Sequence, residues 1–188
     1  MKKILLIVFS SIIFFSCNKE ENFDDAVTPY FRLKSFFNSE MKRMYAEKRT
    51  LNEVCESDGS FDELIYPYPD WYRAFEPFVD CDINKPELNG KYSVDSALTK
   101  NSYGDTRMQV NYRAKEKNLD TQILTVKYDS LHNVVSIHIE VLSEGKFSSV
   151  ESKLDYVSGK RILIKSKENS WMMGESTYGT DGKIGEKF

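Results

Sequence analysis

Three cysteines and two histidines are the side chains of this 188-residue chain with the clearest potential for chemistry. His132 falls in a predicted turn, and His138 points to the polar side of a predicted strand, between Ser136 and Glu140. A nucleophilic hydrolase of the Gly-x-Ser-x-Gly type needs its serine on a strand-to-helix turn. Residues 174–178 read Gly-Glu-Ser-Thr-Tyr and lack the second glycine. No pair of carboxylates stands out for glycoside hydrolysis either. We therefore predict ordinary surface histidines and a protein that is not an enzyme.

Cys17 closes a segment with the features of an export signal. Two lysines follow Met1, and residues 4–15 form a run that is apolar except for two serines. This run is shorter than the ~20 apolar residues that a membrane-spanning helix needs, so we expect export to remove it. A small residue, Ser16, directly precedes Cys17. The segment predicts cleavage before Cys17 and acylation of that residue.

The stretch Phe14-Phe15-Ser16-Cys17 resembles the relaxed lipobox of bacteroidete-type bacterial lipoproteins. It departs at two positions from the common lipobox, which has leucine, a small residue, glycine or alanine, and then cysteine. Lys19-Glu20-Glu21 resembles the signal that exports such lipoproteins to the cell surface, and a merely solvated acidic tether is the alternative. The resemblance implies a signal peptide over 1–16, an acylated tether over 17–27 and anchorage in the outer membrane. It does not extend to the domain at 28–188.

Acylation of Cys17 leaves Cys55 and Cys81 as the remaining thiols. Two cysteines in an exported protein normally form a disulfide, because the compartment is oxidising. The chain has no Cys-x-x-Cys spacing, and two cysteines with two distant histidines are a poor zinc site. We therefore predict a Cys55–Cys81 disulfide.

Composition indicates one soluble globular domain with an uneven charge distribution. Charged residues make up 29% of the chain and apolar residues 40%. Residues 18–90 hold nine Lys or Arg against sixteen Asp or Glu, whereas residues 91–188 hold fifteen against thirteen. Neither half has the basic stripe that nucleic-acid binding requires, so nucleic acid is excluded as a partner.

Apolar residues at steps of three and four predict a long amphipathic helix from Thr28-Pro29 to about Ser57. A capping box at Thr50–Glu53 allows the helix to break near Arg49 and restart. A second capping box predicts a short helix over 60–65, and Asp70 is a candidate cap for another helix that Pro77 ends.

From Gly90 onward the apolar period changes from helical to two, which is typical of strands. Turn signals separate the runs, and seven short strands joined by tight turns predict an antiparallel meander, whose last strand is at Trp171–Met173. The predicted fold is α+β, with the long N-terminal helix packed on a six- to seven-strand sheet. At fold level only, this arrangement resembles half-barrel carriers and cystatin-like proteins.

Seven of the eighteen residues from Phe61 to Phe78 are aromatic, and the charged residues among them are acidic except for Arg73. Exposed tyrosine and tryptophan rings with acidic neighbours suit recognition of a protein or a glycan. The alternative is a lid whose rings are buried against the sheet. The binding hypothesis assigns the contact to five of these residues: Tyr66, Tyr68, Trp71, Tyr72 and Phe75.

Residues 80–84 read Asp-Cys-Asp-Ile-Asn, whose spaced oxygens could suit calcium. Lys85 stands where an EF-hand loop has glycine, and Lys91 where it has glutamate, so we predict a solvated turn and no metal or cofactor. The functional hypothesis is a non-enzymatic binding module at the outer membrane. Its alternatives are an immunity or inhibitor lipoprotein, and a carrier of a lipid or small hydrophobic ligand.

Overall fold

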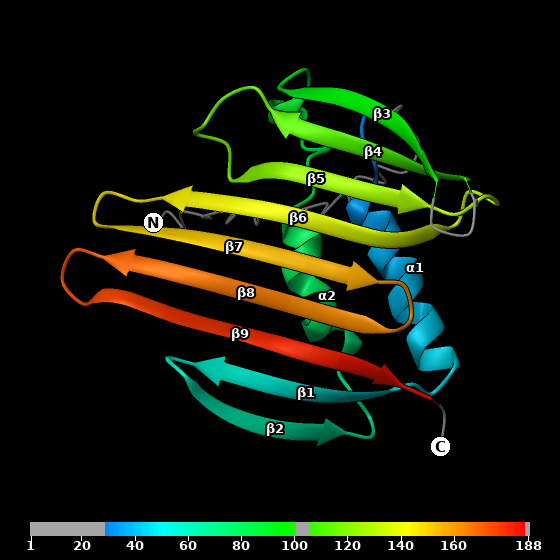
Figure 1. Cartoon of the computed structure of the whole chain (residues 1–188), viewed down its shortest axis with the longest axis horizontal. Helices are drawn as coiled ribbons and strands as arrows, with labels where there is room; N and C mark the ends of the chain where they lie inside the picture. Colours follow the sequence, from blue (N-terminus) through cyan, green and yellow to red (C-terminus); the bar gives the residue numbers. More distant parts are fainter. Residues whose placement is uncertain (1–28, 101–105, 187–188) are drawn as a thin grey trace, which may run out of the picture.

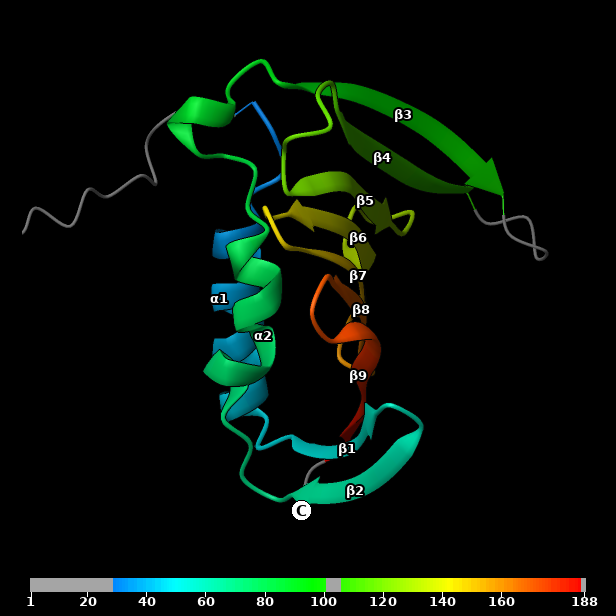
Figure 2. The ribbon, with the colours of Figure 1, turned by 90° about the vertical axis from the view of Figure 1, so that its left-hand side faces the viewer.

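One antiparallel sheet of nine strands curves around two short helices, as a computed structural model of residues 29–100 and 106–186 shows (Figures 1 and 2). The helices lie side by side across the concave side of the sheet. In chain order the elements are α1 (Leu33–Ala46), β1 (Thr50–Ser57), β2 (Ser60–Tyr66), α2 (Trp71–Asp80), the 3₁₀ helix η2 (Pro86–Leu88), β3 (Tyr92–Lys100), β4 (Thr106–Ala114), β5 (Thr121–Tyr128), β6 (Val134–Glu144), β7 (Ser148–Val157), β8 (Arg161–Ser170) and β9 (Gly174–Gly185).

The order of strands across the sheet is β2-β1-β9-β8-β7-β6-β5-β4-β3. The seven strands from β3 to β9 form an antiparallel meander, and the period-two pattern predicts the first six of them. The N-terminal hairpin β1–β2 then joins at the far side, because β1 pairs with the last strand, β9. Two strands, β2 and β3, are therefore the edges of the described sheet.

The predicted long N-terminal helix is wrong, since α1 ends at Ala46. Lys48 adopts a φ of 51°, which a right-handed helix does not accommodate. Leu51 and Val54, which fall within the predicted helix, lie in β1 instead, as does the predicted capping residue Thr50. Leu51 is buried and Asn52 exposed, so the strand period applies here as well.

The predicted strand count is also wrong, because the sheet has nine strands rather than six or seven. Two of the additional strands form the β1–β2 hairpin, where capping-box matches indicated helix. Asp58 and Gly59 make its turn, both with positive φ. The predicted strand at Trp171–Met173 is a turn, and the true last strand begins at Gly174.

The N-terminus of α1 is capped from a distant segment. Arg32 precedes the helix without a capping side chain, but an Asp82 carboxylate oxygen accepts a hydrogen bond from the Lys34 amide at 2.8 Å. Asn84 donates from its side-chain amide to the Phe31 carbonyl at 2.7 Å. The acidic run that could have suited calcium thus fixes the start of α1.

Asp70 caps α2, as we predicted, and accepts hydrogen bonds from the amides of Tyr72 and Arg73. Pro77 does not end the helix, which continues to Asp80. Aromatic residues three and four positions apart line the inner side of α2, where Trp71, Phe75 and Phe78 are fully buried.

Aromatic rings fill the centre of the space between the helices and the sheet. The Phe37 ring of α1 lies 5.1 Å from the Phe75 ring, 5.0 Å from Phe78 and 5.3 Å from Tyr156 of β7. Such edge-on and tilted ring pairs add to the stabilisation that burial of the apolar area provides. Three elements therefore share one aromatic core.

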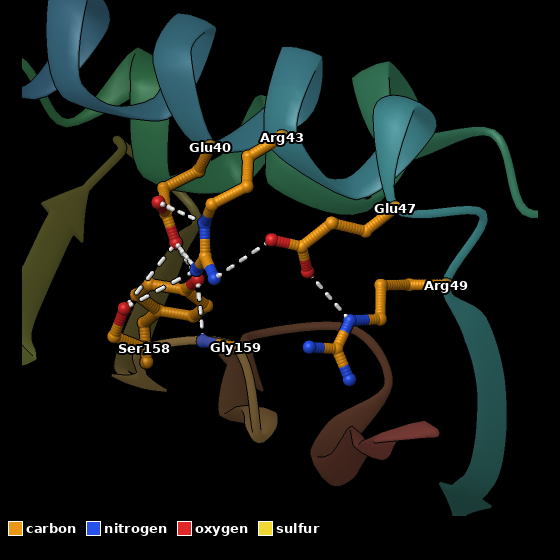
Figure 3. A network of polar contacts seen from close by, with 7 residues as sticks. Glu40, Arg43, Glu47, Arg49, Ser158 and Gly159 are labelled. Atoms are coloured by element: carbon orange, nitrogen blue, oxygen red, sulfur yellow. Dashed lines mark hydrogen bonds and ion pairs between the residues drawn. The ribbon is translucent and has the colours of Figure 1, made fainter. Parts of the chain in front are cut away.

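A buried polar network joins α1 to the β7–β8 turn (Figure 3). The Tyr156 hydroxyl donates to the Glu40 carboxylate and accepts from the Gly159 amide at 3.0 Å. Arg43 donates to both Glu40 oxygens, at 3.0 and 2.5 Å, and to the Ser158 hydroxyl at 3.3 Å. Because every polar group has a partner, the carboxylate is tolerated at 8% exposure.

We predict that Tyr156→Phe lowers the free energy of unfolding by about 1–3 kcal/mol. The change keeps the ring but removes the Tyr156 hydroxyl, which donates to Glu40 and accepts from the Gly159 amide. Urea denaturation at neutral pH measures the effect. Tyr178→Phe is the matched control, because the Tyr178 side chain is 43% exposed on β9. Equal stability of the two variants would contradict the role of the network.

Candidate functional site

The structure separates the five aromatic residues that we assigned to partner binding. Trp71 and Phe75 are 1% and 0% exposed and belong to the core. Tyr66, Tyr68 and Tyr72 are 38%, 92% and 62% exposed. The lid interpretation thus holds for the first two, and only the three tyrosines remain accessible to a partner.

The amphipathic pattern of α2 and the turn before it produce this division. Trp71 and Phe75 are one helical turn apart and face the sheet, whereas Tyr72 lies one position along and faces outward. Tyr68 lies in the connection between β2 and α2. The Tyr45 hydroxyl accepts from the Trp71 amide at 3.1 Å, which ties this connection to the end of α1.

Tyr66 is the last residue of the edge strand β2, and this strand adds further exposed residues to the surface that the tyrosines form. All seven of its residues are exposed. Leu51 is buried toward the helices and pairs with Tyr66, so alternate residues of β2 starting from Tyr66 face the helix side. Large apolar side chains stand on both faces, with Leu64 and Tyr66 inward and Phe61 and Ile65 outward. We call this surface the aromatic edge; its members are Phe61, Leu64, Ile65, Tyr66, Tyr68 and Tyr72.

Charges next to the aromatic edge are mainly acidic. Asp62 and Glu63 lie in the middle of β2, and Glu53 lies opposite Leu64 on β1. Burial raises the pKa of the Glu53 carboxyl, and the positive charge of Arg73 opposes that rise. Arg73 therefore lies within electrostatic reach of Glu53. The edge strand β2 itself carries the negative charges of Asp62 and Glu63.

The predicted disulfide is wrong, because Cys55 and Cys81 are both free thiols. Cys55 lies on β1, whereas the Cys81 carbonyl accepts from the Thr121 hydroxyl of β5 at 3.2 Å. Four strands separate β1 from β5, which is on the order of 20 Å along the sheet. A disulfide needs the two Cα atoms within about 7 Å. The helix α2 carries Cys81 across the concave side and away from its predicted partner.

Neither thiol has the environment of a reactive cysteine. Burial raises the pKa of the Cys81 thiol to about 12, and this thiol donates to the Pro77 carbonyl at 3.1 Å. Burial also raises the pKa of Cys55, and the negative charges of Glu53 and Asp62 add to the effect. Both side chains therefore stay protonated near neutral pH, where a nucleophile would need a thiolate.

The two histidines lie where the sequence placed them, one in a turn and one on a strand. His132 has a φ of 64° in the β5–β6 turn. His138 on β6 meets Asp155 at 2.7 Å through Nδ1 and Glu140 at 3.3 Å through Nε2. Both ring nitrogens contact carboxylates, so neither faces a hydroxyl or thiol. Among residues 29–100 and 106–186, no group of three or more His, Cys, Asp or Glu could hold a metal ion.

Cys17, the predicted lipidation residue, lies outside the described residues. Within the part of the chain that the structure covers, neither helix is long and apolar enough to cross a membrane.

Sequence reasoning missed a second exposed apolar surface, at the turns β6–β7 and β8–β9. Phe147, Trp171, Met172 and Met173 are 63%, 81%, 83% and 84% exposed there. The signal was present in the sequence as three consecutive large apolar residues at a turn position. Assigning Trp171 and Met173 to a strand concealed it.

Comparisons with known proteins do not assign a family. No family model matches the chain, and no curated protein matches it. A search of solved structures finds the S-type phycobiliprotein lyase CPES from Guillardia theta, with 6% identity and a TM-score of 0.26, over 85% of this chain and 99% of that one. A similarity this low supports no conclusion about fold or function.

We predict that stability falls between pH 9 and pH 12 as the unfolded chain loses thiol protons that the folded chain retains. The folded pKa of Cys81 is raised from 9.0 to about 12, so its contribution is complete below pH 9 and is lost as pH rises. The slope approaches ~1.4 kcal/mol per pH unit for one group. Denaturation at several pH values measures it.

Cys81→Ala should flatten this slope more than Cys55→Ala, because Cys81 is the more deeply buried thiol. Thiol labelling provides an independent measurement. Without reductant, both cysteines should react after unfolding and Cys81 should be protected before it. If Cys55 and Cys81 yield no free thiol after unfolding, the conclusion that they lie too far apart for a disulfide is contradicted.

Proposed function

We propose that this protein is a lipid-anchored binding module of the outer membrane that captures an extended basic segment of a partner protein along β2. The observation that carries the proposal is the aromatic edge, where a seven-residue edge strand is exposed over its whole length and has large apolar side chains on both faces.

Edge strands offer unpaired backbone groups to a further strand. On the described sheet β2 pairs with β1 only, so one of its sides is open (Figure 2). A strand added there would gain backbone hydrogen bonds over seven residues, about 23 Å. Soluble proteins normally protect such an edge with short strands or charged residues. The apolar side chains Phe61 and Ile65, each 66% exposed, make β2 suited to a partner instead.

Charge determines which partner segment fits. Asp62 and Glu63 are exposed at the centre of β2. A segment that alternates apolar residues with lysine or arginine would place its charges on one face of the added strand, beside either Asp62 or Glu63, whereas an acidic segment would be repelled by both. Tyr68 and Tyr72 extend the contact beyond the end of the strand and provide rings for cation–π contacts.

The acyl anchor places this binding activity at a membrane. The support is the sequence around Cys17, which predicts lipid attachment after export. Lys19-Glu20-Glu21 supports a position on the cell surface, where partner proteins from outside the cell are accessible.

We predict that the full mature chain binds a ten-residue peptide of alternating valine and lysine and does not bind its valine–glutamate counterpart. Asp62→Lys with Glu63→Lys should weaken lysine-peptide binding about tenfold or more, equivalent to ~1.4 kcal/mol or more, and should favour the glutamate peptide. Fluorescence anisotropy of labelled peptides measures both.

The matched control is Glu87→Lys with Glu116→Lys, an equal change of charge at the opposite end of the sheet. A peptide with a central proline tests strand addition, because proline removes a backbone donor. The proposal fails if the control variant loses as much affinity as the β2 variant, or if the proline peptide binds equally well.

A further inference from the structure

Two neighbouring turns bring four large apolar side chains to one end of the molecule. The turns β6–β7 and β8–β9 lie side by side at the same end of the strands (Figure 1). The Trp171 amide donates to the Phe147 carbonyl at 2.9 Å, and the two rings are 6.5 Å apart. Met172 and Met173 complete the group, which we call the apolar tips.

The apolar tips project beyond the part of the sheet that the helices cover. In Figure 1 the ends of β6 to β9 extend well past α2, and Figure 2 views the molecule from that end. The exposure of the four side chains, from 63% to 84%, agrees with this position. Turns of soluble proteins are normally polar, so such exposure at adjacent turns indicates a surface that is covered in use.

We propose that the apolar tips insert into the interfacial region of a lipid bilayer and orient the domain on the membrane. Trp171 has the amphipathic ring that is enriched at the level of the lipid headgroups. Lys146 lies over the Phe147 ring, 5.4 Å from its centroid, where its ammonium can reach lipid phosphates. Methionines are flexible enough to adapt to acyl chains.

The shape of the surface favours lipid over a protein partner. The residues that flank the tips are small or polar, including Gly145, Ser148, Ser149 and Gly174, so the apolar area is confined to the protruding turns. A shallow groove of about 610 Å³ runs between them, with Glu144 and Asn169 among its lining residues. A stable protein interface needs ~800 Å² on each side with a packed centre, which two narrow turns do not provide.

The inference rests on the proposed membrane anchor for its geometry. Eleven residues, 18–28, separate Cys17 from the described domain, and a fully extended chain of that length reaches ~40 Å at most. The strands β6 to β9 have 10 to 12 residues and are ~33–40 Å long. An anchored domain therefore stays close enough to the bilayer for the tips to contact it.

The two tryptophans allow a direct test on the full mature chain. Trp171 is 81% exposed at the tips, whereas Trp71 is 1% exposed in the core and serves as an internal reference. The chain is incorporated into phosphatidylcholine vesicles whose acyl chains carry bromine, a quencher confined to the membrane. We expect a blue-shifted and quenched Trp171 emission, and Trp171→Phe should leave only unquenched Trp71 emission.

A variant with Phe147→Ser, Met172→Ser and Met173→Ser keeps Trp171 as the probe and should lose the blue shift and the quenching. Leu131→Ser is the control, since Leu131 is 79% exposed at the opposite end of the strands. Its quenching should equal that of the unmodified chain.

Three outcomes separate this inference from the proposed anchor. Mass measurement of the N-terminal peptide reports acylation of Cys17 independently. An unacylated chain whose Trp171 is still quenched at high lipid concentration would contradict the anchor and support the tips. An acylated, vesicle-bound chain whose Trp171 stays open to aqueous acrylamide would overturn the inference. So would a Trp171 shielded from acrylamide but not quenched by bromine, which would indicate a protein contact.

Discussion

The Tyr156 side chain links the two layers of this protein more directly than any other single contact. Its ring packs against Phe37 and Phe75 from both helices, while its hydroxyl donates to the buried Glu40 carboxylate. Burial raises its pKa above the ordinary value, and hydrogen bonding to Glu40 adds to this, so the phenol remains protonated and able to donate. One residue therefore makes both an apolar ring contact and a buried hydrogen bond to α1. Together they fix the position of α1 along the sheet.

The remaining surface features follow from the position of the helices. Because α1 and α2 cover the centre of the concave side, large aromatic residues there become core, including two that sequence reasoning assigned to a binding surface. Strands that extend past the helices keep exposed residues on both faces. The aromatic edge on β2 and the apolar tips on the β6–β7 and β8–β9 turns are both in such uncovered regions. The aromatic edge runs along an edge strand of the sheet, whereas the apolar tips lie at one end of its central strands. A partner segment and a bilayer could therefore be bound at the same time.

Sequence patterns predicted the meander well and the N-terminal third poorly. Period-two alternation located β3 to β8, because each of these strands is bounded by turn residues. The segment 50–66 contains both helix-capping spacings and β-branched residues, and local signals alone favoured helix. Pairing with β9 decided the outcome, since β1 completes its backbone hydrogen bonds against a strand more than 100 residues away. The predicted disulfide failed for a related reason. Its distance depends on where α2 crosses the sheet, which no local pattern contains.

The sequence by itself predicted an export signal with a lipidation residue, and it determined the antiparallel class of the sheet and the cap of α2, because these depend on neighbouring residues and short periods. Only the tertiary structure decided which aromatic rings are buried, that both cysteines are free, and that Asp82 caps α1 across 48 residues of chain. It also decided that β2 is an edge and that Phe147 and Trp171 meet. Each of these properties depends on long-range packing, whose geometry is set when the sheet curves around its helices.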